Sequence, residues 1–143
     1  MILCATLDNV MSAMRLFKKQ IEENFLAEIG SQAVAMFRCG DFNGLANKFG
    51  YSLAHERDKA LAIEQDLRKC LRESGINGLN WSLDNASVDV KYYRPNSANL
   101  CAVIECLIPM ENEGGVLAEI VVTSVGSAYH VALEDVNVYS GSH

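Results

Sequence analysis

The stretch that decides the fold of this chain is residues 116–139, VLAEIVVTSVGSAYHVALEDVNVY. Apolar and polar side chains alternate over Val116–Thr123, which predicts a strand with one buried face. Gly126-Ser127 predicts a two-residue hairpin loop with glycine first, as a type II′ turn prefers. The strand after this loop is expected to run to about residue 139. Its alternation changes phase near Glu134-Asp135, which indicates a bulge.

Two further alternating stretches precede this hairpin. One covers residues 87–93 and the other covers residues 100–107, and the turn Arg94-Pro95-Asn96-Ser97 separates them. A glycine-containing loop, residues 109–115, then leads into the hairpin. Four sequential strands joined by short connections predict an antiparallel meander.

Before Asn77-Gly78 the apolar residues recur at helical spacing instead of alternating. The predicted helices cover residues 8–29, 31–39 and 41–49, and a fourth helix has its inner stripe over residues 63–71 and ends near Ser74-Gly75. Gly30 is expected to end the first helix, and Asp41 is expected to cap the start of the third. We therefore predict a two-layer α+β fold in which the N-terminal helices pack on one face of a four-stranded antiparallel meander.

The chain of 143 residues has the length of one ordinary domain. We expect a single domain with a helical half, residues 1–76, and a sheet half, residues 77–140. Residues 141–143 are either a native tail or the start of a tag linker. The residues expected in the core are Phe17, Phe25, Leu67, Val90, Ile104, Ile120 and Val122.

The composition excludes some classes of function and favours others. The formal net charge is −6, from 18 acidic and 12 basic residues. Because nucleic-acid affinity is largely phosphate neutralisation, this balance argues against a nucleic-acid partner and favours a basic protein. The five cysteines are odd in number and irregularly spaced, which predicts free thiols and a cytoplasmic location. We expect no membrane span and no cofactor, because the sequence carries neither a membrane-length apolar run nor a phosphate-binding loop.

Counting pairs back from the hairpin loop predicts the strand register. The expected opposite pairs are Thr123 with His130, Val121 with Ala132, Glu119 with Glu134, Leu107 with Leu117, and Glu105 with Glu119. Glu105, Glu119 and Glu134 then form a row on the sheet face away from the helices, and Asp89 lies nearby on the same face. Like charges directly opposite one another cost a few tenths of a kcal/mol to about 1 kcal/mol per pair.

Three interpretations of this row remain open. It is a polar, solvated sheet face, or a surface that binds a basic partner, or a carboxylate site for a cation such as Mg²⁺ or Mn²⁺ in a small enzyme. A homodimer that buries the face is a further alternative, although like charges would then meet across the two-fold axis. We predict partner binding without catalysis. The expected partner-binding residues are Asp89, Glu105, Glu119, Glu134, Val103, Val121 and His130.

Two resemblances bear on function. The segments Gly40-Asp41-Phe42, Leu45-Ala46, Phe49-Gly50-Tyr51, Ala62-Ile63-Glu64 and Asp66-Leu67 are similar to small bacterial proteins of uncharacterised type. In size, acidity and helix-then-sheet layout the whole chain resembles immunity proteins of contact-dependent growth-inhibition and related toxin systems. That resemblance implies a cytoplasmic antidote that binds and occludes a toxin domain, often a basic nuclease. It is one of general character, and it transfers no site residue to this sequence.

Overall fold

The computed structural model of this chain describes residues 14–17, 22–73, 86–110 and 114–139. Its helices are α2 (Glu23–Cys39), α3 (Phe42–Phe49), the short 3-10 helix η2 (Ser52–Ala54) and α4 (Lys59–Glu73). Its strands are β1 (Met14–Phe17), β2 (Ser87–Tyr92), β3 (Leu100–Pro109), β4 (Gly115–Val125) and β5 (Ala128–Tyr139).

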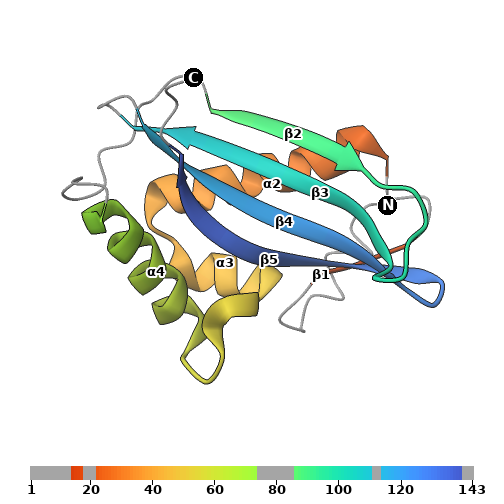
Figure 1. The fold of residues 1–143 in the computed structure, drawn as a ribbon, viewed down its shortest axis with the longest axis horizontal. Coiled ribbons are helices and arrows are strands. Elements are labelled where there is room, and N and C mark those ends of the chain that lie inside the picture. The colour runs from red at the N-terminus through yellow and green to blue at the C-terminus, as the bar shows by residue number, and fades with distance from the viewer. Residues whose placement is uncertain (1–13, 18–21, 74–85, 111–113, 140–143) are drawn as a thin grey trace.

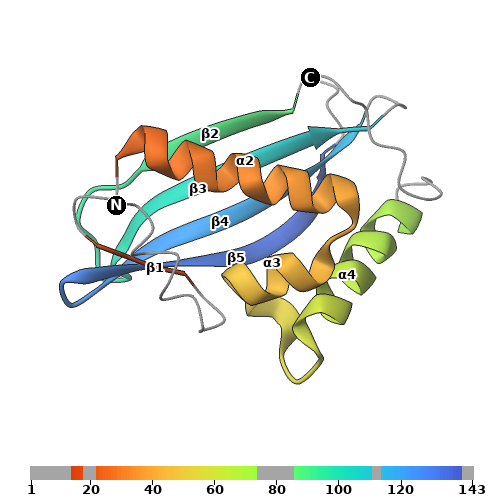
Figure 2. The same ribbon diagram turned by 180° about the vertical axis from the view of Figure 1, so that it is seen from behind.

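The strands form one antiparallel sheet in the order β1-β5-β4-β3-β2. β2 to β5 are the predicted meander, and the helices pack against one face of it, so the predicted α+β fold class is confirmed. Figure 1 looks onto the sheet with the helices behind it, and Figure 2 shows α2, α3 and α4 in front. The hairpin loop is also confirmed, because Val125 pairs with Ala128 and Gly126 has a φ of 62°.

The first predicted helix is wrong in two respects. Residues 14–17 form a strand that pairs with β5, and α2 begins only at Glu23. Over only four residues, helical periodicity in the sequence is a weak determinant of secondary structure. Hydrogen bonding of residues 14–17 to the edge strand β5 overrides it. The rest of the predicted helix N-terminal to Glu22, residues 8–13 and 18–21, lies outside the described residues.

Gly30 does not end a helix but lies inside α2, which continues to Cys39. A Cβ atom built at Gly30 would lie 2.5 Å from Cγ1 of Val88 and 2.8 Å from Cγ2 of Ile104. The thiol of Cys106 also lies 3.7 Å from the Gly30 carbonyl oxygen. At Gly30 the backbone of α2 therefore lies in close contact with the sheet. The helix ends at Gly40, which has a φ of 72° and donates its N–H to the last-turn carbonyls.

The core lies between the helices and the inward face of β3, β4 and β5. Of the predicted core residues, Leu67, Ile104, Ile120 and Val122 are fully buried. Phe25 and Val90 are half-buried and pack against the core, and the side chain of Phe17 lies outside the described residues. The largest fully buried side chains are Phe37, Phe49, Leu26, Ile29, Leu45, Ile63, Leu67, Leu71, Ile104 and Ile108.

The cysteines in the described segments are free thiols, namely Cys39, Cys70, Cys101 and Cys106. Cys106 is fully buried, and burial raises its pKa to about 12. It therefore behaves as a small apolar core residue and not as a nucleophile. The fifth cysteine, Cys4, lies outside the described residues.

Candidate functional site: an acidic row on the open sheet face

One face of the sheet has no described helix over it (Figure 1). Its side chains come from alternate positions of the strands. In β3 and β4, Ala102, Ile104, Ala118 and Ile120 point into the core and are fully buried. The residues between them, such as Glu105 and Glu119, therefore point to the opposite face. We call this opposite side the open face.

Four carboxyl groups cross the open face in one line. Asp89 of β2 pairs with Glu105 of β3, Glu105 pairs with Glu119 of β4, and Glu119 pairs with Asp135 of β5. We call these four residues the acidic row. The predicted pairing of Glu105 with Glu119 is confirmed, and Asp89 lies directly opposite Glu105 rather than only nearby.

The predicted partner of Glu119 on β5 is wrong. The register shifts between Glu119 and Ile120, so Ile120 pairs with Leu133 while Glu119 pairs with Asp135. The extra residue at this bulge is Glu134, which accepts a hydrogen bond from the Ser52 hydroxyl of η2 at 3.1 Å. The change of phase near Glu134-Asp135 signals the bulge in the sequence. Asp135 was missed because the register count took no account of that extra residue.

Apolar pairs flank the centre of the acidic row on both sides. Val103 pairs with Val121 on one side, and Leu107 pairs with Leu117 on the other. Val103 is only 8% exposed although it lies on the open face. Glu105 and Glu119 therefore stand in a partly apolar surface, and this reduces the solvation of their charges.

His130 belongs to the open face but lies away from the acidic row. It pairs with Thr123 as predicted, and on its other side with Arg15 of β1. Along β5, Ala132 and the bulge separate His130 from Asp135. The structure therefore brings together Asp89, Glu105 and Glu119 with Val103 and Val121, and it leaves His130 and Glu134 at the margins of this group.

Glu119 is the most perturbed carboxyl group of the row. Desolvation is the first cause that raises its pKa to about 7, followed by a hydrogen bond with Asp135 and repulsion from Asp135, Glu105 and Glu134. Oδ1 of Asp135 is buried and has no hydrogen-bond donor among the described residues. A proton on Glu119 supplies a donor toward Asp135, and this is why the hydrogen bond between the two carboxyl groups raises the pKa of Glu119.

One cation lies beside the row. Nζ of Lys91 is 3.2 Å from Oε1 of Glu105, and this carboxylate raises the pKa of Lys91. Both side chains are solvent-accessible, so water screens the attraction and the pair contributes little to stability. The repulsion in the row is therefore partly offset at Glu105, whereas at Glu119 it adds to the desolvation that raises the pKa of this carboxyl group.

The Glu119→Gln variant is expected to be more stable than the parent at pH 8, by about 1 kcal/mol after allowance for solvent screening. Because folding raises the pKa of Glu119, the folded parent binds the proton more tightly than the unfolded chain. The cost of ionising Glu119, from desolvation first and then from repulsion, is therefore absent below about pH 4.5 and reaches its full value above about pH 7. Denaturant unfolding of both proteins at pH 5 and pH 8 measures the difference, which should be larger at pH 8.

The matched control for this variant is Glu105→Gln, which removes a neighbouring charge of the same row. Because Glu105 contacts Lys91, the control loses an ion pair and should gain no stability at pH 8. Equal stabilisation by both substitutions, or a Glu119→Gln effect that does not depend on pH, would contradict the raised pKa of Glu119.

The interpretation of the row as a cation site requires carboxyl groups that converge on one point. In the segments that the structure describes, no three histidine, cysteine, aspartate or glutamate side chains are grouped so as to hold a metal ion. The acidic row is a line across neighbouring strands, whereas Mg²⁺ requires ligands converging on one point.

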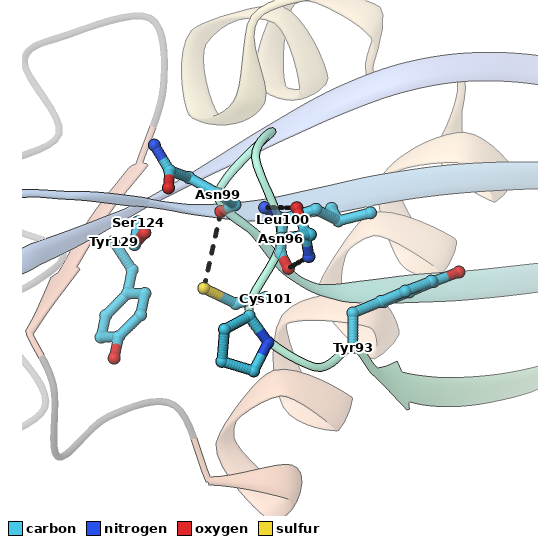
Figure 3. A pocket seen from close by; sticks show the side chains of 8 residues that line it. Tyr93, Asn96, Asn99, Leu100, Cys101, Ser124 and Tyr129 are labelled. Atoms are coloured by element: carbon cyan, nitrogen blue, oxygen red, sulfur yellow. Dashed lines mark hydrogen bonds between the residues drawn. The ribbon is translucent and has the colours of Figure 1, made fainter.

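A hollow of about 260 Å³ lies at the end of the sheet between the β2–β3 turn and the β4–β5 hairpin (Figure 3). Tyr93, Cys101 and Tyr129 line it, together with the turn residue Asn96. The Asn96 side chain already donates to the carbonyls of Arg94 and Leu100 and accepts from two backbone N–H groups. It therefore holds the turn together instead of offering free groups to a ligand. No residue of the acidic row lines this hollow.

Comparison with known proteins adds no family, because no protein-family model, curated protein or solved structure matches this chain. None of the helices in the described segments is both long and apolar enough to cross a membrane. The class that the fold and this surface define is therefore an α+β domain with helices on one face of its sheet and an acidic row on the other.

Proposed function

We propose that this chain is a binding protein that neutralises a basic partner through the open face, and that the partner is a bacterial toxin domain such as a nuclease. The observation that carries the proposal is the uninterrupted acidic row, flanked by apolar pairs, on a face that no described helix covers. Charged groups surrounded by apolar side chains are typical of binding surfaces. The charges select the partner, and the apolar surface that is buried in the complex adds to the affinity.

The energetic cost of the row supports this proposal. Desolvation of Glu119 and the like charges opposite it both disfavour its ionised form in the free protein, and they contribute to its raised pKa. Lysine or arginine side chains of a partner would relieve the repulsion at Glu119 and Asp135. A surface that is strained alone and relaxed in a complex favours the complex, because the relief adds to the binding free energy.

Charge also accounts for the choice of partner. A nuclease domain carries a basic surface that binds phosphates, and a line of carboxylates can occupy that surface in their place. The net charge of −6 attracts such a partner over long distances and raises its association rate. This is the physical role of an immunity protein, the family that the chain resembles in size, acidity and layout.

Co-purification from the native host tests the proposal. The parent chain, a Glu119→Lys variant and a Glu28→Lys variant serve as baits in parallel. Glu28 is an exposed residue of α2, in the helical layer, so the control makes the same change of charge away from the open face. We expect a basic protein with the parent and with Glu28→Lys, and at least about tenfold less of it with Glu119→Lys.

The recovered protein is then assayed for toxicity or nuclease activity with and without the parent chain. We expect the parent chain to suppress that activity. A partner that binds the Glu119→Lys variant as tightly as the parent, or one that is active while bound, would contradict the proposal.

A further inference from the structure

We propose that the hollow at the end of the sheet, between the β2–β3 turn and the β4–β5 hairpin, binds a small, uncharged heteroaromatic ring such as a nucleobase. The inference goes beyond the proposed function, because the hollow uses none of the residues of the acidic row. It rests on three observations, namely the size of the hollow, the rings and polar groups that line it, and the hydrogen bonds that hold its walls in place.

The size of the hollow limits the ligand to one ring system. Its volume of about 260 Å³ is just below the range of roughly 300–1,000 Å³ that is typical of sites for drug-sized ligands. Its lining residues come from the β2–β3 turn, the start of β3, the end of β4 and the start of β5. A planar ring or a fused ring pair with a few substituents fits this space, whereas a dinucleotide or a folded peptide segment would extend beyond it.

Rings make up much of the lining. Tyr93 and Tyr129 contribute phenol rings and Pro95 contributes its pyrrolidine ring, while Leu100 and Cys101 complete the apolar surface. Figure 3 shows Tyr93 and Tyr129 on opposite sides of Cys101. Tyr129 and Cys101 also pack against the core, which holds them in position. Aromatic side chains bind planar rings by stacking, and every nucleobase can stack because each has a π-face.

The polar part of the lining selects a ligand that has hydrogen-bonding groups at its edge and no charge. The Asn99 carboxamide presents a donor and an acceptor side by side, and the Ser124 hydroxyl presents both in one group. A carboxamide pairs in this way with the edge of adenine, where an amino group and a ring nitrogen lie next to each other. The lining contains no Asp, Glu, Lys, Arg or His, so a charged ligand would lose solvation here without gaining an ion pair.

Hydrogen bonds hold the walls of the hollow in place before a ligand binds. The Ser124 N–H donates to the Asn99 carbonyl at 2.9 Å, which links the β2–β3 turn to the end of β4. The Tyr93 N–H donates to the Cys101 carbonyl, also at 2.9 Å. Asn99 has a φ of 57°, a conformation that asparagine adopts more readily than most residues.

The side-chain hydrogen bonds of Asn96 order the rest of the turn. A site that is already ordered loses little binding free energy to the ordering of its own residues. The hollow therefore suits a small ligand, which makes too few contacts to order a mobile loop.

An NMR titration of the full chain with adenosine, up to about 10 mM, tests this inference. We expect the backbone N–H signals of Asn99, Cys101 and Ser124 to shift together, with a dissociation constant of about 1 mM, as suits a ligand of this size in an open site. Adenosine monophosphate carries the same base and a phosphate. It should bind no more tightly than adenosine, because the lining offers no cationic side chain.

Two substitutions separate the contribution of the rings from that of the polar groups. Tyr93→Ala removes a ring that is 47% exposed, so the fold should tolerate it, and it should raise the dissociation constant at least about fivefold. Asn99→Gly removes the carboxamide but accepts the positive φ, and it should raise the constant at least about threefold. Tyr139→Ala is the matched control, because Tyr139 is an exposed tyrosine at the other end of β5, and it should leave the constant within about twofold of the parent.

Circular dichroism confirms that each variant is folded. A titration that leaves the three N–H signals unshifted would overturn the inference. A dissociation constant that Tyr93→Ala and Asn99→Gly leave unchanged would overturn it as well, since adenosine would then bind elsewhere. Tighter binding of adenosine monophosphate than of adenosine would also overturn it, because the phosphate and not the ring would then be recognised.

Discussion

Replacing Gly30 with alanine is expected to lower the free energy of unfolding by about 2 kcal/mol, even though alanine favours helices over glycine by up to about 1 kcal/mol. The added Cβ would lie 2.5 Å from Val88 and 2.8 Å from Ile104, both of which are stiff β-branched side chains. Either α2 must move away from β2 and β3, or these side chains must leave their preferred rotamers. Denaturant unfolding measures the change.

Ser31→Ala is the matched control for Gly30→Ala, because Ser31 is the next residue of α2 and is exposed. It should be neutral or slightly stabilising, since alanine has the higher helix propensity. If Gly30→Ala stabilised the protein like the control, the close contact between α2 and the sheet would be wrong.

Replacing Asp66 with alanine is expected to cost about 2–3 kcal/mol of stability. Asp66 on α4 accepts a hydrogen bond from the Tyr51 hydroxyl at 2.8 Å and two from the Arg57 guanidinium at 2.8 and 3.1 Å. Tyr51 is only 5% exposed, so the substitution leaves its buried hydroxyl without this acceptor. Arg57 also donates to the Leu53 and Ala54 carbonyls, so the network holds η2 against α4.

Glu64→Ala is the control for Asp66→Ala. Glu64 is on the same helix and forms only an exposed pair with Arg68 at 3.0 Å, so its loss should cost less than about 0.5 kcal/mol. The hydrogen bond with Arg57 lowers the pKa of Asp66. The stabilisation by Asp66 should therefore be present at neutral pH and be lost as the pH falls through that lowered pKa. Similar losses for both variants would contradict the network.

The sheet was predictable from the sequence because its signals are local and strong. Alternation over residues 100–107 and 116–123, with glycine at the first hairpin position, predicts both strands and their pairing, which the structure shows as β3 and β4. The pairs from Val125 with Ala128 to Val121 with Ala132 follow from the loop alone. The pairing of Glu105 with Glu119 needed one further condition, namely that residues paired across β3 and β4 point to the same face of the sheet.

The rest depends on contacts that the local pattern does not reveal. β1 is a strand because it adds to the edge of β5, and Gly30 is inside a helix because β2 and β3 lie against it. The change of phase in the sequence indicated a bulge near Glu134-Asp135. It did not indicate which residue of β5 is the extra one, and this decides whether Glu134 or Asp135 pairs with Glu119. Each of these depends on tertiary packing, which overrides weak local preference.

The association rate of the parent chain with its recovered basic partner, measured across a series of salt concentrations, tests the central claim most directly. Charges on the open face should make this rate fall steeply as salt increases. At pH 8, above the raised pKa of Glu119, the Glu119→Gln variant removes one charge without adding bulk, so it should bind more slowly at low salt and with a shallower salt dependence. Equal rates and equal slopes for parent and variant would contradict the claim that the acidic row binds the partner.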